Sequence, residues 1–286
     1  MAITFRADKN QITNKVLKIM KNRGFVDICA YFDRDSTVRK QVAYSDWDFM
    51  GCLSKFCDLE SVDYAVEMLK NIKVIDNNAI YNKREFEYLR KEVKGINSGL
   101  QGRSSSFEGG KFKIPWTTIS PMMERILYML SSVRKPKVIA AFGTYCGSSL
   151  AWIAGPTIGN NPSFKCNRIY GVDIDSSSIE IARKNFSKLK SARHVHLVAE
   201  DGIKFAKNMH ESCDLIYLDA NKVYLDILKM IYPRLEPNTW VLAHDVTHRF
   251  IRQQYDDYLK FVRNKNNFKI SICFDLDLYG LELSIK

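Results

Sequence analysis

Acidic side chains recur at the ends of apolar runs in the second half of this 286-residue chain. A histidine stands beside one of them, and a lysine follows another after three residues. These residues are Asp173, Asp201, Asp219, Lys222, His244 and Asp245. Carboxylates at strand ends can hold the hydroxyls of a ribose or a divalent cation, and a lysine or histidine can accept a proton. The residue types therefore predict a ligand site at one edge of a sheet.

A glycine turn precedes these acids. Residues 138–142 form a short apolar run that predicts a strand buried on both faces; Gly143 and Gly147 then bracket a turn, and a helical run extends from about Ser148 to Gly155. Such a turn brings backbone N–H groups close to a ligand. The spacing is neither G-x-G-x-x-G nor a P-loop, which disfavours hydride and phosphoryl transfer. A plain tight turn between packed elements remains an alternative.

Strands and helices alternate after the turn. Apolar runs at 168–175, 195–199, 213–218 and 239–243 predict strands, and 179–188, 203–209 and 224–232 predict helices. This alternation is typical of a doubly wound α/β sheet, which binds ligands at the carboxyl ends of its strands. Asp173 has the position of a ribose-binding acid. Asp175, next to three serines, fits a helix cap or turn, and Ser177 and Glu180 have capping-box spacing.

Two motifs resemble a known family. Gly143-Thr-Tyr-Cys-Gly-Ser-Ser149 resembles the G-x-Y-C-G-x-S loop of catechol O-methyltransferase. Leu218-Asp-Ala-Asn-Lys222 resembles the segment of catechol and caffeoyl-CoA O-methyltransferases that carries a metal-binding Asp and, three residues on, a Lys. The order of motifs over residues 114–286 implies a class I S-adenosylmethionine-dependent methyltransferase. Its Rossmann-like sheet is expected to be mostly parallel, with an antiparallel last strand within 274–283.

The resemblance implies a role for each residue. Gly143, Tyr145, Gly147 and Ser149 would contact the methionine part of S-adenosylmethionine, Asp173 its ribose and Asp201 its adenine. Asp219 and Asp245 would bind a divalent cation, with Mg²⁺ as the first expectation because the ligands are oxygens. Asp219 is also expected to lie against the cofactor. Lys222 would be the general base.

The sequence departs from the family pattern at two places. Val246 stands where the caffeoyl-CoA enzymes have an Asn ligand, and Ala141 where members often carry an acid that touches the cofactor. His244 is the expected substitute ligand, although imidazole suits zinc or iron better than magnesium. In the alternative interpretation, Asp219 and Asp245 contact cofactor or substrate or occupy turns, and Lys222 is a solvated lysine that opens a helix.

The overall composition limits the cellular setting. The net charge of +11 is spread along the chain without basic runs interleaved with aromatics, so nucleic acid is not the expected partner. Seven cysteines without a C-x-x-C pair argue against a disulfide framework and for a reducing compartment. No apolar stretch approaches membrane-spanning length. We therefore expect a cytoplasmic protein without a membrane partner.

Residues 1–95 are expected to form a smaller, mainly helical domain. Helices are predicted at 10–23, 46–57, 61–72 and 83–93, with a strand at 25–32 and a hairpin at 73–81 that turns on 76–78. The pattern resembles winged-helix modules that dimerise and close the substrate pocket of some O-methyltransferases, which implies a homodimer. Residues 96–113 have linker composition, and with Trp116 they are predicted to form a lid before a helix at 120–131.

The sequence predicts an O-methyltransferase that acts on a hydroxyl, phenolic in the first instance, of a small-molecule secondary metabolite. A metal-independent or N-directed small-molecule methyltransferase remains an alternative, as does a cofactor-binding scaffold without turnover. An RNA methyltransferase is a further alternative, although the Asp-Pro-Pro-Tyr or Asn-Pro-Pro-Tyr signature of base methylation is absent and Leu218-Asp-Ala-Asn221 stands in its place.

Overall fold

The computed structural model describes residues 2–6, 62, 65–67, 69–94, 111–114, 119, 121–247, 252–275 and 279–286. The helices expected at 10–23 and 46–57, the strand at 25–32, Trp116 and most of the linker lie outside the described residues. The helix expected at 61–72 is described in part, and all its described residues up to 71 are helical.

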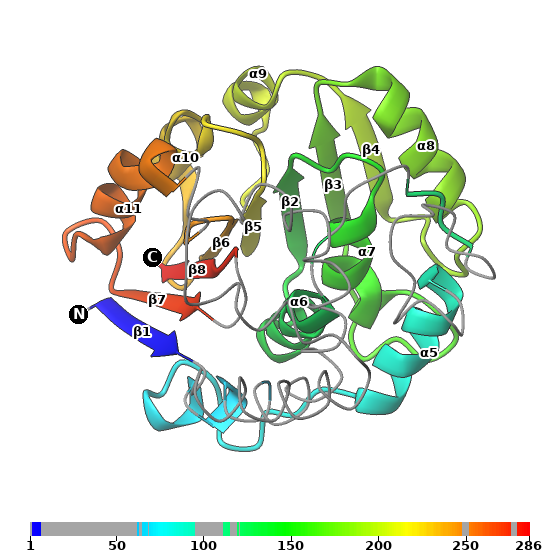
Figure 1. The fold of residues 1–286 in the computed structure, drawn as a ribbon, viewed down its shortest axis with the longest axis horizontal. Coiled ribbons are helices and arrows are strands. Elements are labelled where there is room, and N and C mark those ends of the chain that lie inside the picture. Colours follow the sequence, from blue (N-terminus) through cyan, green and yellow to red (C-terminus); the bar gives the residue numbers. More distant parts are fainter. Residues whose placement is uncertain are drawn as a thin grey trace, which may run out of the picture.

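One sheet of eight strands organises the described chain, in the order β1-β7-β8-β6-β5-β2-β3-β4 (Figure 1). The strands are β1 (Ala2–Arg6), β2 (Val138–Phe142), β3 (Arg168–Asp173), β4 (Val195–Ala199), β5 (Leu215–Leu218), β6 (Trp240–His244), β7 (Ile270–Asp275) and β8 (Leu281–Ile285). Only β8, among these strands, runs antiparallel to its neighbours β6 and β7. The expected doubly wound, mostly parallel sheet with an antiparallel last strand is confirmed.

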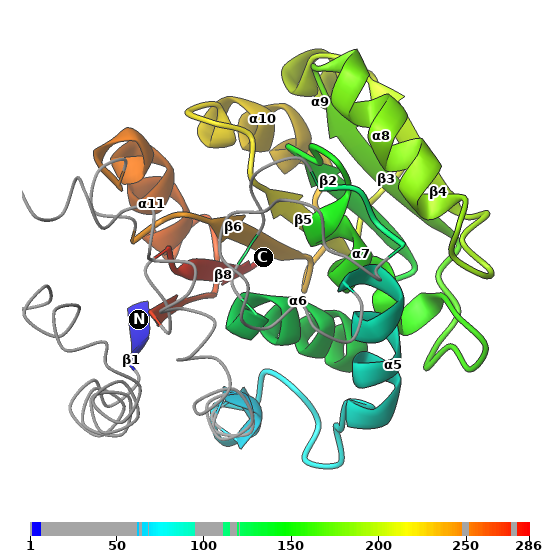
Figure 2. The same cartoon turned by 45° about the vertical axis from the view of Figure 1, so that its right-hand side comes forward.

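Helices cover both faces of the sheet (Figure 1, Figure 2). One layer contains α6 (Pro121–Arg134), α7 (Ser148–Ala154) and α8 (Ser176–Phe186), with α5 (Lys83–Lys94) packed outside it. The other contains α9 (Gly202–Asn208), α10 (Tyr224–Ile231) and α11 (Asp256–Arg263). Three short 3₁₀ helices are η1 (Gly155–Thr157), η2 (Tyr232–Arg234) and η3 (Arg252–Tyr255). Within the described residues, none of the helices is long and apolar enough to cross a membrane.

The central strands are apolar on both faces because each face packs under a helix layer. In β2, Ile139 and Ala141 join the hydrophobic cluster on the α6–α7 side, whereas Ala140 and Phe142 join the cluster on the α9–α11 side. Every residue of β2, β5 and β6 is buried. These continuous apolar runs are what parallel strands covered on both sides require.

The N-terminal residues join the same sheet and core. β1 pairs in parallel with β7, from Ala2 opposite Ser271 to Arg6 opposite Asp275. Phe86 and Leu89 of α5 lie in the cluster that contains Trp152 of α7. Residues on both sides of the expected linker therefore share one hydrophobic core, and the division into two domains at residues 96–113 stays a prediction.

Two local expectations are wrong. Residues 73–81 contain the expected turn, in which Asn78 and Ala79 donate their backbone N–H groups to the side chain and carbonyl of Asp76, but no strands flank it. Val74 and Ile75 pack singly against the core, and Ile80 is exposed. None of the described strands pairs with this segment. In addition, α8 begins at Ser176 and is capped by Asp175, not by a box of Ser177 and Glu180.

Candidate functional site

A cleft of about 600 Å³ opens at the carboxyl ends of β2, β3, β5 and β6. Its described walls come from the glycine turn, from the residues that follow each strand, and from Tyr279 in the connection between β7 and β8. The predicted site residues that line it are Gly143, Tyr145, Ser149, Asp173, Asp201, Asp219, His244 and Asp245. Gly147 and Lys222 are not among the described lining residues. The strand-end arrangement thus brings together eight of the ten predicted residues.

The glycine turn passes very close to the end of β5. Gly143 has φ of 83°, and a Cβ atom there would lie 2.2 Å from the carbonyl oxygen of Asp219. Gly147, with φ of 85°, is the N-cap of α7, and a Cβ there would meet the ring of Phe186 at 2.8 Å. Both positions need a residue without a side chain, because left-handed backbone and close contact coincide. Gly147 therefore fixes the shape of the turn, although it is not among the described residues that line the cleft.

Asp173 is held in place by the glycine turn. Its Oδ2 accepts a hydrogen bond from the backbone N–H of Tyr145 at 2.7 Å, and its Oδ1 accepts one from the N–H of Asp175 at 3.0 Å. Each oxygen keeps a further lone pair for a donor in the cleft. A carboxylate fixed in this way at the tip of the second strand can bind the two hydroxyls of a ribose. The next residue, Ile174, is 73% exposed at the cleft wall.

Two neighbouring aspartates cap helices. Asp201 lines the cleft and also accepts the backbone N–H of Lys204 at 2.8 Å, as the N-cap of α9. Asp175 caps α8, and hydrogen bonds from Ser178 and Ser177 lower its pKa. The predicted capping role of Asp175 is confirmed. Asp201 combines capping with a place in the cleft wall.

Asp219, His244 and Asp245, which we call the acid–histidine cluster, meet at the ends of β5 and β6. One potential ligand atom from each lies within 4.8 Å of the others. The Nδ1 atom of His244 is 3.1 Å from Oδ1 of Asp245 and 3.5 Å from Oδ1 of Asp219. His244 is buried, and Asp245 has φ of 62°, an uncommon value for a residue with a side chain. Strained backbone of this kind is frequent at ligand sites.

Buried tyrosines support the acid–histidine cluster. Tyr217 donates its hydroxyl to Oδ2 of Asp219 at 3.0 Å, and Tyr224 donates its hydroxyl to the carbonyl of His244 at 3.1 Å. Tyr255 stacks on Tyr224 with ring centroids 4.4 Å apart. Burial raises the pKa of Tyr217 and Tyr224 well above the usual value, so both remain protonated donors.

Sequence reasoning missed Tyr217, Tyr224 and Tyr279. The ring of Tyr279 lies 5.9 Å from that of His244 and lines the cleft. For Tyr217 a signal was present, because a tyrosine two residues before a site aspartate interrupts an otherwise aliphatic strand. Tyr279 gave no such signal, since its position depends on the antiparallel return of β8.

The donor set of the acid–histidine cluster fits a divalent cation that accepts both oxygen and nitrogen. Val246 is buried among the core residues on the α9–α11 side, so it cannot replace the Asn ligand of the family pattern. The ring of His244 could supply a nitrogen in its place. Two carboxylates with an imidazole favour manganese, iron or zinc more than magnesium. Ala141, the other departure, is a core residue.

Lys222 lies on the loop between β5 and α10. Its side chain is exposed, and its backbone has φ of 59°. Its neighbours Asn221 and Val223 line the cleft. The lysine is therefore at the margin of the site, and its role as a base stays a prediction.

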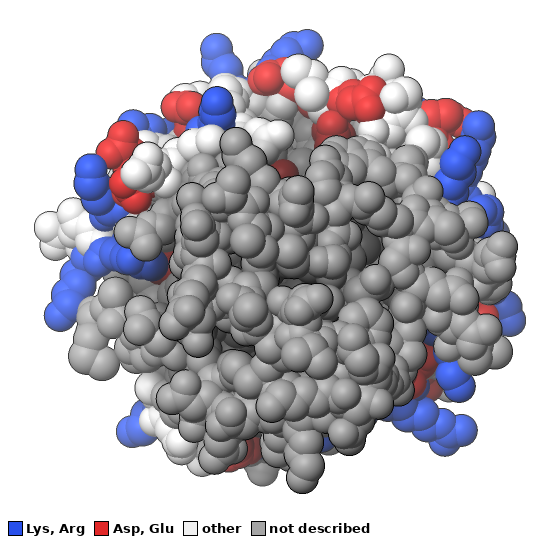
Figure 3. Space-filling model, viewed as in Figure 1, with Lys and Arg blue, Asp and Glu red and all other residues white. Residues whose placement is uncertain are grey.

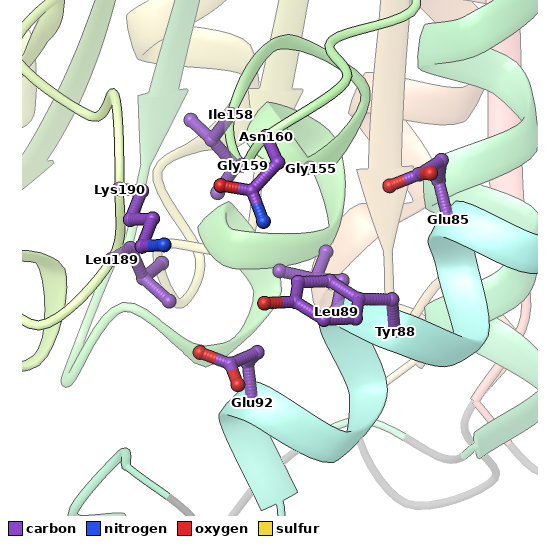
Figure 4. Close-up of a pocket in the computed structure, with 10 residues that line it drawn as sticks. All are labelled: Glu85, Tyr88, Leu89, Glu92, Gly155, Ile158, Gly159, Asn160, Leu189 and Lys190. Atoms are coloured by element: carbon purple, nitrogen blue, oxygen red, sulfur yellow. The ribbon is translucent and has the colours of Figure 1, made fainter.

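A second hollow lies far from the strand ends. Figure 4 shows Tyr88 and Leu89 of α5 facing the loop that carries Asn160, with Lys190 across from them. Its volume of about 20 Å³ holds roughly one water molecule. It offers no room for a substrate. On the face shown in Figure 3, described basic and acidic side chains alternate around the rim, in line with the diffuse charge of the sequence.

Comparisons with known proteins match parts of the chain. Residues 141–246 match the model of a family described as a methyltransferase domain. Stretches of 55 and 57 residues are 42% and 35% identical to polyamine aminopropyltransferases of Thermoplasma acidophilum and Thermoplasma volcanium. These stretches cover 18% and 19% of this chain and 20% and 21% of those proteins. The chain thus matches about a fifth of the length of these curated relatives.

Solved structures share the fold. A Staphylococcus aureus protein assigned as a caffeoyl-CoA O-methyltransferase aligns with TM-score 0.53 and 16% identity, over 80% of this chain and 100% of that one. A Podospora anserina methyltransferase bound to SAH aligns with TM-score 0.52 and 19% identity, over 79% and 95% of the two chains. The sheet order, the glycine turn and the family match at residues 141–246 agree, and residues 141–246 carry a methyltransferase domain within a Rossmann-like sheet.

Proposed function

We propose that the protein is an S-adenosylmethionine-dependent O-methyltransferase that acts on a hydroxyl, most simply a phenolic one, of a small-molecule secondary metabolite with the help of a divalent cation. The observation that carries this proposal is the shared cleft. In it the carboxylate of Asp173, fixed by the N–H of Tyr145, lies on the same sheet edge as the acid–histidine cluster. The end of the cleft at Asp173 suits a nucleoside cofactor, and the end at the acid–histidine cluster suits the activation of an acceptor.

The described residues account for binding and orientation. The cofactor supplies a methyl group on a positively charged sulfur, and a cation held by Asp219, His244 and Asp245 would lower the pKa of an acceptor hydroxyl. Asp173 would fix the ribose, Asp201 would lie by the adenine, and the glycine turn with Tyr145 and Ser149 would border the methionine part. Lys222, at the margin of the cleft, would take the proton of the acceptor. Positioning of the two reactants then provides most of the rate.

An amine acceptor is the second candidate. Among the described residues that line the cleft, four are aspartates and none is a lysine or arginine, although the chain as a whole carries a charge of +11. Such a wall attracts a cation. The short similarity to polyamine aminopropyltransferases points in the same direction. Turnover with polyamines and none with catechols would favour this candidate.

We also propose a cytoplasmic homodimer with a lid at residues 96–110; the last linker residues, 111–113, are bound to α5 and Asn185, and Phe112 is buried in the core. The described cysteines, Cys146, Cys166, Cys213 and Cys273, are buried and form no disulfide with one another, which suits a reducing compartment. The dimer rests on the resemblance of the N-terminal segment to dimerising modules. Light scattering after size-exclusion chromatography tests it, and a monomeric mass would contradict it.

Calorimetric titration with S-adenosylmethionine tests the proposed function. The unaltered protein should bind, and Asp173→Asn should weaken binding by about 10-fold to 100-fold, because a hydrogen bond to a charged group contributes about 1.5–3 kcal/mol. Asp175→Asn is the matched control, since Asp175 is adjacent but caps α8 and is absent from the described cleft wall. Equal weakening by both variants would contradict the ribose role, and no binding by the unaltered protein would overturn the proposal.

A further inference from the structure

Tyr217 connects two parts of the proposed site. Its side chain projects from β5 toward the α6–α7 layer and is fully buried. Its hydroxyl donates to Oδ2 of Asp219 at 3.0 Å, and the side chain of Ser149, in the first turn of α7, is another polar neighbour of that hydroxyl. A phenol has one proton, and here the carboxylate receives it. Toward the Tyr217 oxygen, the Ser149 hydroxyl can therefore act only as a donor.

This arrangement fixes the orientation of the Asp219 carboxylate. Oδ2 is occupied by the Tyr217 hydroxyl, whereas Oδ1 is the oxygen that lies 3.5 Å from Nδ1 of His244. Without the tyrosine, rotation about the terminal torsion of Asp219 could exchange the two oxygens, because that torsion is broad. With it, Oδ1 stays the oxygen that faces His244.

A hydroxyl at this position has no role in packing. The neighbouring strand residues Ile216 and Leu218 are aliphatic and fully buried, and phenylalanine would fill the volume of the tyrosine ring. Burial of a hydroxyl costs free energy unless it is hydrogen-bonded. Here it is satisfied by Asp219, and both Asp219 and Ser149 line the cleft. The ring of Tyr217 therefore belongs to the core, and its hydroxyl acts on residues of the cleft.

We propose that Tyr217 is a positioning residue, which holds Asp219 so that it offers one oxygen to a divalent cation shared with His244 and Asp245, and which connects that carboxylate to Ser149 on the cofactor side of the cleft. This inference rests on the proposed function. It specifies that the orientation of the Asp219 carboxylate depends on a residue outside the cluster.

The substitution Tyr217→Phe tests the role, since it removes the hydroxyl and keeps the ring. Tyr258→Phe is the matched control, because Tyr258 is also buried, in α11, and the polar groups that act on its hydroxyl are Glu282, Ser284 and Arg263. Binding of Mn²⁺ is measured from the electron paramagnetic resonance signal of the free ion, binding of S-adenosylmethionine by calorimetry, and stability by thermal unfolding. Partners that orient metal ligands typically contribute about 10-fold to 100-fold in metal affinity.

We expect Tyr217→Phe to weaken Mn²⁺ binding by about tenfold or more, with unfolding temperature and S-adenosylmethionine affinity close to those of Tyr258→Phe. Ser149→Ala, which removes the other end of the chain of donors, should weaken Mn²⁺ binding by a smaller factor and provides the test if Tyr217→Phe does not fold. Unchanged Mn²⁺ affinity in Tyr217→Phe, or in Ser149→Ala if that variant alone folds, would overturn the inference.

The outcomes separate this inference from the proposed function. If the unaltered protein binds S-adenosylmethionine but not Mn²⁺, the positioning role is wrong while the methyltransferase proposal stands. If it binds Mn²⁺ but not S-adenosylmethionine, the proposed function fails, and the comparison of Tyr217→Phe with Tyr258→Phe still decides the positioning role.

Discussion

Single residues at this cleft combine several constraints. Asp173 receives two backbone N–H groups from different loops, and Asp201 caps a helix while it lines the cleft. The sequence indicated both from their place after a strand. It could not show that the glycine turn holds Asp173, because Tyr145, which donates to Asp173, lies 28 residues earlier in the chain. The local sequence pattern thus predicts where these aspartates lie, but not how their side chains are oriented.

At the residue scale, the base assigned to Lys222 is directly testable. Lys222→Ala should lower turnover by about 10²-fold to 10⁴-fold, the usual contribution of a general base, and leave S-adenosylmethionine affinity unchanged. Steady-state kinetics with calorimetry separates the two effects. Lys229→Ala, at an exposed position on α10, is the control. Unchanged turnover in Lys222→Ala would remove the lysine from the mechanism.

His194 makes stability depend on pH. Burial, followed by the nearby His196, lowers its pKa below 6.5, and its Nε2 lies 2.8 Å from the hydroxyl of Thr157. Above pH 6.5 the residue is neutral in both states and contributes no pH dependence. Below pH 6.5, His194 binds a proton more readily in the unfolded chain than in the folded protein. The free energy of unfolding therefore falls as the pH is lowered through the pKa that His194 has in the folded protein.

Urea unfolding of the unaltered protein and of His194→Gln, at several pH values between about 8 and 5, checks this expectation. The loss of stability on acidification should be smaller in the variant. If the free energy of unfolding depended on pH equally in both proteins, the pKa of His194 would not differ between the folded and unfolded states.

At the element scale, the glycine turn depends on the strand beside it. Gly143→Ala should be destabilising, because left-handed backbone costs about 1–2 kcal/mol for a residue with Cβ. The clash of that Cβ with the Asp219 carbonyl, at 2.2 Å, adds to this cost and should also weaken S-adenosylmethionine binding. Gly159→Ala is the control, since Gly159 has φ of 96° but open space around it.

Denaturant unfolding and calorimetry of both glycine variants measure these effects. Gly159→Ala should show the conformational cost alone and bind the cofactor normally. If Gly143→Ala lowered neither the stability nor the cofactor affinity more than Gly159→Ala does, the close approach of the turn to β5 would not matter for the site.

The elements differ in how well the sequence predicted them. The strands at 138–142 and 195–199 were predicted to the residue, because turn signals bound their apolar runs. β1 was not predicted, since its pairing with β7 joins residues from opposite ends of the described chain. Residues 73–81 form no strands for a related reason, because a short segment forms a stable strand only beside another strand or against a packed surface.

At the scale of the whole molecule, cofactor binding should stabilise the fold. A ligand at about 100 times its dissociation constant adds about 2.7 kcal/mol, which corresponds to a rise of roughly 5 °C in the unfolding temperature of a domain of this size. Thermal unfolding with S-adenosylhomocysteine measures it, with ATP as the control ligand. An equal rise with ATP would argue against a site specific for the methionine-bearing nucleoside.

The sheet order also governs how the molecule is made. β8 lies between β6 and β7, yet it is the last of the eight strands to be synthesised. Until residues 281–285 leave the ribosome, β6 and β7 have no strand between them, and the apolar edge of β6 stays open. Unpaired apolar edges are sites of misassociation. The edge of β6 in a nascent chain therefore stays open to such contacts until residues 281–285 can pair with it.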